Sequence, residues 1–135
     1  MTKYPVKVLL AFSEALEGND KFYQWLFNNA YPELSALASA IKGNAEAFDW
    51  LMKRNFPHLA AFCNALDNDE KALLWLKKYK NDFLLIFAEA CKGKPSAIDW
   101  LNKNNLKIFT LIAIRIKRVK DQLDIDYEDY HKIHF

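Results

Sequence analysis

Four tryptophans at a constant spacing constrain the fold of this chain more than any other feature. They lie 25 residues apart, and a leucine follows each of them: Trp25, Trp50, Trp75 and Trp100. A fixed period of about 20–50 residues is the signature of a stacked repeat array. We therefore expect a tandem-repeat protein whose units pack against their neighbours.

The repeat can be followed through residues 8–32, 33–57, 58–82 and 83–107, and an eroded fifth unit covers residues 108–123. The second and fourth units share 11 of 25 residues, which indicates duplication. Apolar residues recur at positions 2, 5 and 9 of each unit, and this spacing places them on one side of a helix. Each unit therefore begins with an amphipathic helix.

Turn-forming residues divide each unit into two parts. Position 11 is glycine in three units and asparagine in the third, which suits a left-handed helix C-cap. Position 12 is mostly Asn or Asp, the residues preferred at a helix N-cap, and Pro95 in the fourth unit fits the first position of a helix. A second break precedes the next unit, as at Tyr31-Pro32 and Phe56-Pro57. Each unit is predicted to be two short antiparallel helices of about 10–12 residues.

The predicted fold class is all-α. The prediction is an α-solenoid of four 25-residue helix-turn-helix repeats with a C-terminal capping helix and tail. We expect one domain over residues 1–123, followed by an acidic and aromatic tail over residues 124–135. Helices this short are marginally stable alone, so stacking between neighbours has to stabilise them.

Part of the repeat resembles known helical-repeat families. The pattern Ala40-x-x-Gly43-Asn44-x-x-Ala47-Phe48-x-Trp50-Leu51 is similar to the helix pair of ankyrin repeats, and the Gly-Asn-x-x-Ala turn is similar to that of tetratricopeptide-type repeats. The resemblance covers residues 8–107. The units are about eight residues shorter than an ankyrin repeat, without its β-hairpin finger and its Thr-Pro-Leu-His opening.

Composition narrows the classes of function. Hydrophobic residues make up 52% of the 135-residue chain, which is too many for a disordered protein, and the net charge of +2 gives no large basic field. No stretch reaches the roughly 20 apolar residues of a membrane span, and the N-terminus does not fit a signal peptide. Cys63 and Cys91 occupy different repeat positions and predict no disulfide framework. We therefore expect a cytoplasmic protein without a membrane anchor.

The tryptophan series could be a stacking platform for bases or sugars. Helical spacing instead places these side chains with neighbouring apolar positions, so packing in the core is the favoured interpretation. On that interpretation, Trp50→Ala should lower the free energy of unfolding by about 3–5 kcal/mol.

The candidate partner-binding surface runs along the first helices. Positions 3, 7 and 10 of each unit are predicted to point away from the apolar stripe. Positions 7 and 10, which we call the first-helix ribbon, hold Glu14, Glu17, Ser39, Lys42, Asn64, Asp67, Glu89 and Lys92. The first helices typically line the concave ligand-binding face in ankyrin and tetratricopeptide arrays, so the resemblance implies that this ribbon binds a protein partner. Plain variation of solvated side chains is the open alternative.

The segment Ile108–Ile116 is apolar almost all round, although a terminal repeat should have a polar outer face. Two explanations are open. The tail, with Tyr127, Tyr130 and Phe135, could fold back over the segment. Alternatively, a second copy of the chain could cover it in a homo-oligomer.

A nucleic-acid-binding helical repeat is the alternative class of function. Lys53, Lys78 and Lys103 recur at position 21, and residues 115–120 form a basic cluster. We expect Asp49 and Asp99 to pair with the lysines four residues later, and the acidic residues after position 120 to neutralise the cluster locally. Nucleic acid is therefore the less favoured partner.

Residue patterns that indicate catalysis or metal binding are weak. The acidic tail has no glycine for an EF-hand loop, and His131 and His134 have no assured third ligand. Neither cysteine has an identifiable base beside it, so both are expected to be inert thiols. We expect no enzyme activity, no metal site and no cofactor.

Overall fold

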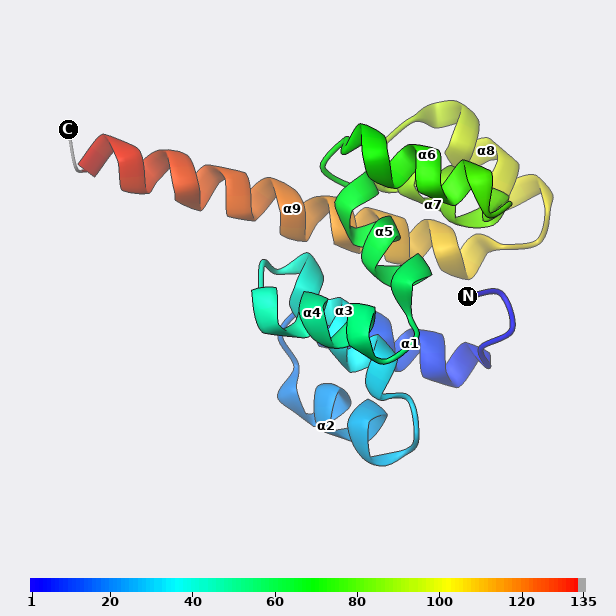
Figure 1. Ribbon diagram of the computed structural model, residues 1–135, viewed down its shortest axis with the longest axis horizontal. Helices are drawn as coiled ribbons and strands as arrows, with labels where there is room; N and C mark the ends of the chain where they lie inside the picture. The colour runs from blue at the N-terminus through cyan, green and yellow to red at the C-terminus, as the bar shows by residue number, and fades with distance from the viewer. Residues whose placement is uncertain (134–135) are drawn as a thin grey trace.

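The computed structural model describes the backbone of residues 1–133 and the side chains of residues 1–127. Over this part the chain is all-α and forms consecutive helix-turn-helix units, as the sequence predicts (Figure 1). The first helices of the four units are α1 (Val6–Leu16), α3 (Pro32–Ile41), α5 (Pro57–Ala65) and α7 (Asp82–Cys91). The second helices are α2 (Asp20–Asn28), α4 (Ala45–Lys53), α6 (Glu70–Lys78) and α8 (Pro95–Lys103), and the long helix α9 (Lys107–Ile133) follows them.

The predicted turn chemistry between paired helices is confirmed. Gly18, Gly43 and Gly93 have φ angles of +87°, +99° and +86°, and Asn68 takes the same place with φ of +61°. The side chain of Asn44 accepts a hydrogen bond from the Ala47 backbone N–H at 3.0 Å and so caps α4. These turns reverse the chain at the same position of every repeat.

A second left-handed residue follows each second helix, and the sequence interpretation did not foresee it. It is never glycine in this chain: Ala30, Asn55, Lys80 and Asn105 have φ between +57° and +71°. Left-handed conformations of residues other than glycine are uncommon, although asparagine adopts them more readily than most residues. The residue type at this position therefore gave little indication of the turn.

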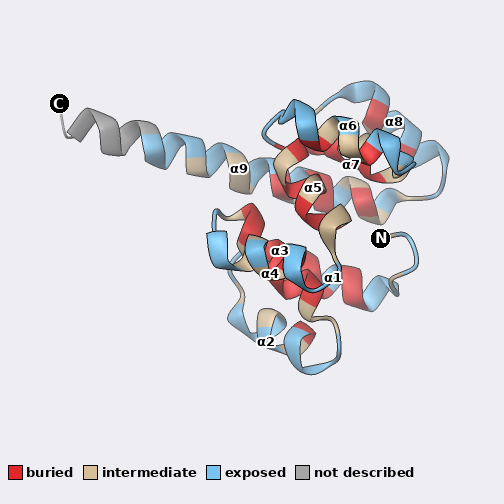
Figure 2. Ribbon diagram, viewed as in Figure 1, coloured by how far each residue is buried: buried red, intermediate tan, exposed pale blue. Residues whose placement is uncertain are grey.

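The core follows the predicted helix stripe. The residues at positions 2, 5 and 9 of all four units are buried: Leu9, Phe12, Leu16, Leu34, Leu37, Ile41, Leu59, Phe62, Leu66, Leu84, Phe87 and Cys91. Figure 2 shows this buried surface concentrated along the first helices, while the second helices are mostly exposed. The first helices thus form an inner layer and the second helices an outer one.

The expectation that the tryptophans pack in the core is confirmed only in part. Trp25, Trp50 and Trp75 are partly buried and pack against the core, whereas Trp100 is exposed. Each leucine that follows a tryptophan is fully buried, as Leu51 is, whereas Trp50 is half-buried and Trp100 is exposed. One residue turns a helix by about 100°, so the leucine faces the core and the tryptophan lies at its edge. Trp50 stacks there on Phe56, with 6.1 Å between the ring centroids. The guanidinium carbon of Arg54 also lies over the Trp50 ring, 5.7 Å from its centroid.

The inner helices close into a ring. Each first helix contacts the next, α7 contacts α9, and α9 returns to contact α1. Figure 1 shows α9 crossing the molecule between α1 and the α7–α8 pair and then projecting beyond the other helices. The last helix therefore joins both ends of the repeat array.

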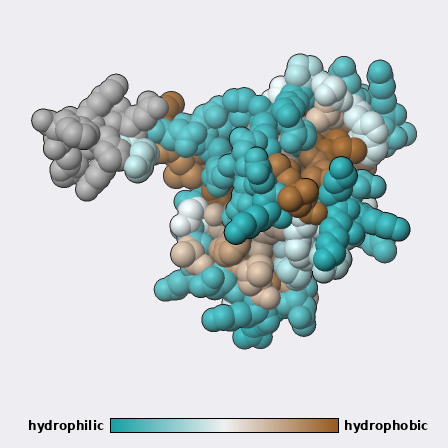
Figure 3. Space-filling model, turned by 45° about the horizontal axis from the view of Figure 1, so that its top comes forward, coloured by the Kyte–Doolittle hydropathy of each residue, from teal (hydrophilic) through white to brown (hydrophobic). Residues whose placement is uncertain are grey.

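The expected fold-back of the tail is also wrong. Because α9 continues as one helix to Ile133, residues 124–133 extend away from Ile108–Ile116 instead of covering it. Phe135, which the sequence placed in the cover, lies outside the described residues. The array itself buries part of that segment, namely Phe109, Ile112, Ala113 and Ile116. Leu111 and Ile114 stay exposed. The face of the molecule drawn in Figure 3 is mostly hydrophilic and has hydrophobic area within it. Self-association through Ile108–Ile116 remains a prediction.

Candidate protein-interaction site

The amphipathic sequence of α9 sets its orientation against the array. Phe109, Ile112 and Ile116 lie three or four residues apart, which places them on one buried face. Phe109 contacts the rings of Phe83 and Phe87 on α7 at centroid distances of 4.8 and 5.3 Å. With this face buried, the basic residues of segment 115–120 lie along the flanks of the helix, next to the ends of the first helices.

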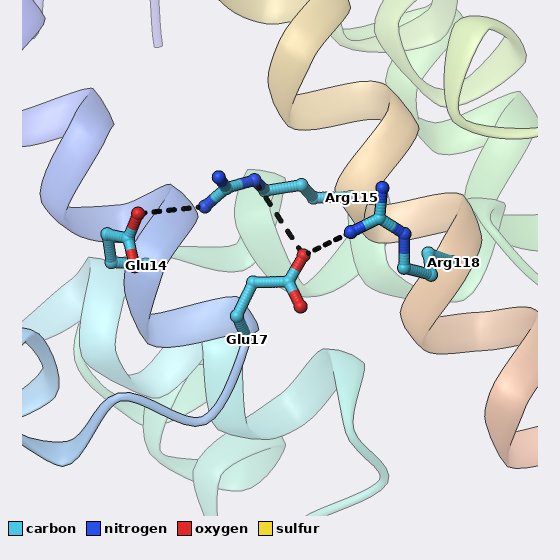
Figure 4. Close-up of polar contacts among 4 residues, drawn as sticks. All are labelled: Glu14, Glu17, Arg115 and Arg118. Carbon is cyan, nitrogen blue, oxygen red and sulfur yellow. Dashed lines mark hydrogen bonds and ion pairs between the residues drawn. The ribbon is translucent and has the colours of Figure 1, made fainter.

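Glu14 and Glu17 of the first-helix ribbon pair with this basic cluster (Figure 4). Nη1 of Arg115 donates a hydrogen bond to Oε1 of Glu14 at 3.1 Å, and its Nε lies 3.7 Å from Oε1 of Glu17. Nη1 of Arg118 donates to the same Glu17 oxygen at 3.0 Å. The C-terminal end of α1 adds a partial negative charge that favours both arginines. The result is a four-residue charge network between the first and last helices.

A second ion pair joins α9 to the third repeat. Nζ of Lys120 lies 2.9 Å from Oδ1 of Asp67, which follows α5. The remaining cation, Lys117, pairs within α9 with Asp121 at 2.7 Å. Every basic residue of segment 115–120 therefore has an acidic partner, and three of the eight ribbon residues bind α9 directly.

Two ribbon lysines stabilise the ends of neighbouring helices. Nζ of Lys42 donates to the backbone carbonyl oxygen of Ala15 at 2.7 Å, which satisfies one of the unpaired carbonyls at the end of α1. Nζ of Lys92 donates to Oδ1 of Asn68 at 2.7 Å in the preceding turn. These contacts link consecutive repeats, a structural role that the sequence interpretation did not foresee.

Hollows border α9 on both sides where it passes the ends of the first helices. One, of about 330 Å³, is lined by Leu16, Glu17, Lys42, Arg118, Val119, Gln122 and Leu123. The other, of about 190 Å³, is lined by Leu66, Asp67, Cys91, Lys92, Ile116, Lys117, Lys120, Asp121 and Asp124. The structure thus gathers five predicted ribbon residues around a single helix: Glu14, Glu17, Lys42, Asp67 and Lys92.

The other three ribbon residues lie apart from α9. Ser39 lines a hollow beside Trp50, and Asn64 is half-buried on α5. Glu89 pairs with Lys94 and Lys92. Burial opposes the charged form of Glu89, but these two cations outweigh it and lower the pKa of the carboxyl below its ordinary value.

The lysines of the nucleic-acid alternative are exposed at the ends of their helices. Lys53, Lys78 and Lys103 are the last residues of α4, α6 and α8. The predicted ion pairs from Asp49 and Asp99 do not form, and none of the three lysines has an ion pair among the described residues. Solvated lysine side chains gain little from such pairs, which explains their absence.

The cysteines lie in the core. Burial raises the pKa of Cys63 to about 11, with Lys120 opposing and Asp67 reinforcing the shift. Burial also raises the pKa of Cys91 well above its ordinary value. Both thiols therefore stay protonated at neutral pH, and a protonated thiol is a poor nucleophile.

Among the described residues, no three His, Cys, Asp or Glu side chains come together as a group that could hold a metal ion. His131 and His134, the sequence candidates, lie outside the residues whose side chains are described. No helix in the described part of the chain is long and apolar enough to cross a membrane.

Comparisons with protein-family models, curated proteins and solved structures gave no match.

Proposed function

We propose that this protein is a non-enzymatic protein-interaction module whose first-helix ribbon binds basic amphipathic helices. The observation that carries the proposal is the position of α9, which lies along the ribbon with three cations on three ribbon carboxylates. The chain itself therefore provides an example of the ligand: apolar residues on one face and arginine or lysine on the flanks. Docking of an amphipathic helix in a groove is a common mode of peptide recognition.

The resemblance to ankyrin and tetratricopeptide repeats supports this proposal, because their first helices typically line the ligand-binding face. A cytoplasmic location belongs to the same proposal and rests on the reduced cysteines expected from the sequence. In this view α9 is the resident occupant of the ribbon, and a partner helix competes with it. A competing ligand gains in apparent affinity when the resident helix is displaced.

The proposal can be tested by weakening α9 in the full-length chain. Arg115→Glu with Arg118→Glu places like charges opposite Glu14 and Glu17 and should release the middle of α9. A fluorescent peptide of residues 107–127 is then added as the probe. We expect the double variant to bind it about fivefold more tightly than the unchanged chain, because losing about 1 kcal/mol of docking energy weakens competition from its own helix by that factor. Fluorescence anisotropy measures the binding.

The matched control is Lys103→Glu with Lys107→Glu, which makes the same change in net charge away from these ion pairs. This control should leave peptide binding unchanged, and a peptide that carries both arginine reversals should not bind. Circular dichroism verifies that each variant stays helical. If the folded Arg115→Glu, Arg118→Glu variant bound the peptide no better than the unchanged chain, the proposal would be wrong.

Nucleic-acid binding is a second candidate function, supported by the exposed Lys53, Lys78 and Lys103, none of which has an ion pair among the described residues. The ion pairs of segment 115–120 weaken it, since those cations are not free for phosphates. On this alternative, affinity for a single-stranded oligonucleotide should fall with salt, with a log–log slope of about −0.7 per phosphate contact. Changing the three lysines to glutamate should abolish oligonucleotide binding at every salt concentration. Oligonucleotide binding that changes with neither the salt concentration nor these substitutions would exclude the alternative.

A further inference from the structure

The outer side of the first repeat exposes an apolar surface. Val6, Leu10 and Phe22 are exposed on α1 and α2, and Leu10 retains 45% of its accessible surface. A hollow of about 230 Å³ lies in the same region and is lined by Lys7, Ala11, Lys21, Phe22 and Trp25. Exposed apolar side chains and a hollow thus lie together on this side of the first described repeat.

The other repeats show what normally covers such a surface. Leu10 occupies position 3, where Ser35 and Ala60 are 1% and 0% exposed in the next two repeats. The prediction that position 3 faces solvent is therefore wrong for these repeats. The Ser35 hydroxyl donates to the backbone oxygen of Tyr23 at 2.8 Å, so the second helix of the preceding repeat lies directly against it. Because α1 is the first helix in the described part of the chain, no such helix lies against Leu10.

The hollow beside Trp50 in the second repeat corresponds to the hollow beside Trp25 in the first. It also measures about 230 Å³, and two side chains of α2, Tyr23 and Phe27, help to line it. They are four residues apart and therefore lie one turn apart on the same side of α2. The hollow of the first repeat has the equivalent lining from its own repeat, Ala11 and Trp25, but no aromatic pair from a preceding helix.

The charge around the hollow of the first repeat indicates the charge of its partner. Lys7 and Lys21 are exposed at its rim, and neither has an ion pair among the described residues. Nζ of Lys7 lies 5.6 Å from the ring centroid of Trp25, which holds a cation above the aromatic lining. An acidic partner complements this rim, and the net charge of +2 on the chain also attracts it.

We infer that the outer side of α1 and α2 binds an acidic amphipathic helix of another protein. The partner helix presents two aromatic side chains one turn apart, in the way that α2 presents Tyr23 and Phe27 to the second repeat. It takes the place of a preceding second helix, with its apolar face on Leu10 and Phe22 and its carboxylates beside Lys7 and Lys21. This surface is separate from the first-helix ribbon and does not depend on the function proposed for that ribbon.

A designed peptide provides the probe. It is a lactam-bridged helix that carries a tyrosine and a phenylalanine four residues apart, with glutamates at the flanking positions. We expect saturable binding to the full-length chain by fluorescence anisotropy. Leu10→Glu and Lys21→Glu should each weaken it at least tenfold, because the first places a charge in the apolar contact and the second repels the glutamates. Leu74→Glu, at an exposed leucine of α6, is the matched control and should have no effect.

Four results would overturn this inference. Three come from the peptide: the absence of saturable binding, binding that survives Leu10→Glu, and equal binding of a peptide with both aromatics changed to alanine. The fourth is a dimer in sedimentation that Leu10→Glu dissociates, because a second copy would then occupy the surface. The Arg115→Glu, Arg118→Glu variant should bind this peptide normally, which separates failure here from failure of the ribbon proposal.

Discussion

Phe87→Ala should lower the free energy of unfolding by about 3–5 kcal/mol, the usual cost of truncating a buried aromatic residue. Phe87 is completely buried on α7. Its ring stacks on Phe62 of α5 at 5.0 Å and on Phe83 at 5.7 Å, and meets Phe109 of α9 edge-on at 5.3 Å. The substitution therefore leaves a cavity where the third repeat, the fourth repeat and the closing helix meet.

Chemical denaturation followed by circular dichroism measures this change. Phe27→Ala is the matched control, because it removes the same atoms from a side chain that is 56% exposed, and it should cost less than about 1 kcal/mol. Equal losses for the two variants would show that α5, α7 and α9 do not share the core described here.

Leu51→Ala should destabilise the protein more than Trp50→Ala, although tryptophan is the larger side chain. Leu51 is fully buried, so its truncation should cost about 2–5 kcal/mol through lost burial and the cavity left behind. Trp50 is half-buried at the edge of the core, and part of its ring already meets solvent. We expect a loss of about 2 kcal/mol or less for Trp50→Ala, below the 3–5 kcal/mol expected from the sequence.

Parallel urea titrations of the two variants measure the difference. Tryptophan fluorescence, from three tryptophans in Trp50→Ala and four in Leu51→Ala, and circular dichroism give independent midpoints. A larger loss for Trp50→Ala would restore the tryptophan as the core residue of the repeat and contradict the orientation of α4.

The periodic features of the fold could be predicted from the sequence because they are local. The spacing of Leu9, Phe12 and Leu16 places them on one helix face, and Gly18 marks the turn that follows. Local spacing also left one ambiguity. A tryptophan and the leucine after it differ by only one residue step, so helical spacing placed both on the apolar face, whereas only the leucines are fully buried.

The candidate site was predictable only in part. The positions of the ribbon residues followed from helix geometry, but their contact with α9 did not. Arg115 and Glu14 are 101 residues apart, and the acidic residues after Lys120 suggested that the basic cluster was neutralised nearby. The structure pairs only Lys117 in that local way and directs the arginines to α1. The contact of α9 with α1 joins residues far apart in the sequence, so the pattern within a single repeat does not predict it.

The arginines of α9 hold this helix along the first-helix ribbon. A charge-swap cycle in the whole chain probes that placement. Glu14→Arg with Glu17→Arg, and separately Arg115→Glu with Arg118→Glu, should each lower the free energy of unfolding, by about 1 kcal/mol for partly exposed pairs. Combining all four substitutions should recover at least half of the summed loss, because opposite charges again face each other. Losses that simply add in the combined variant would contradict the placement of α9 on the ribbon.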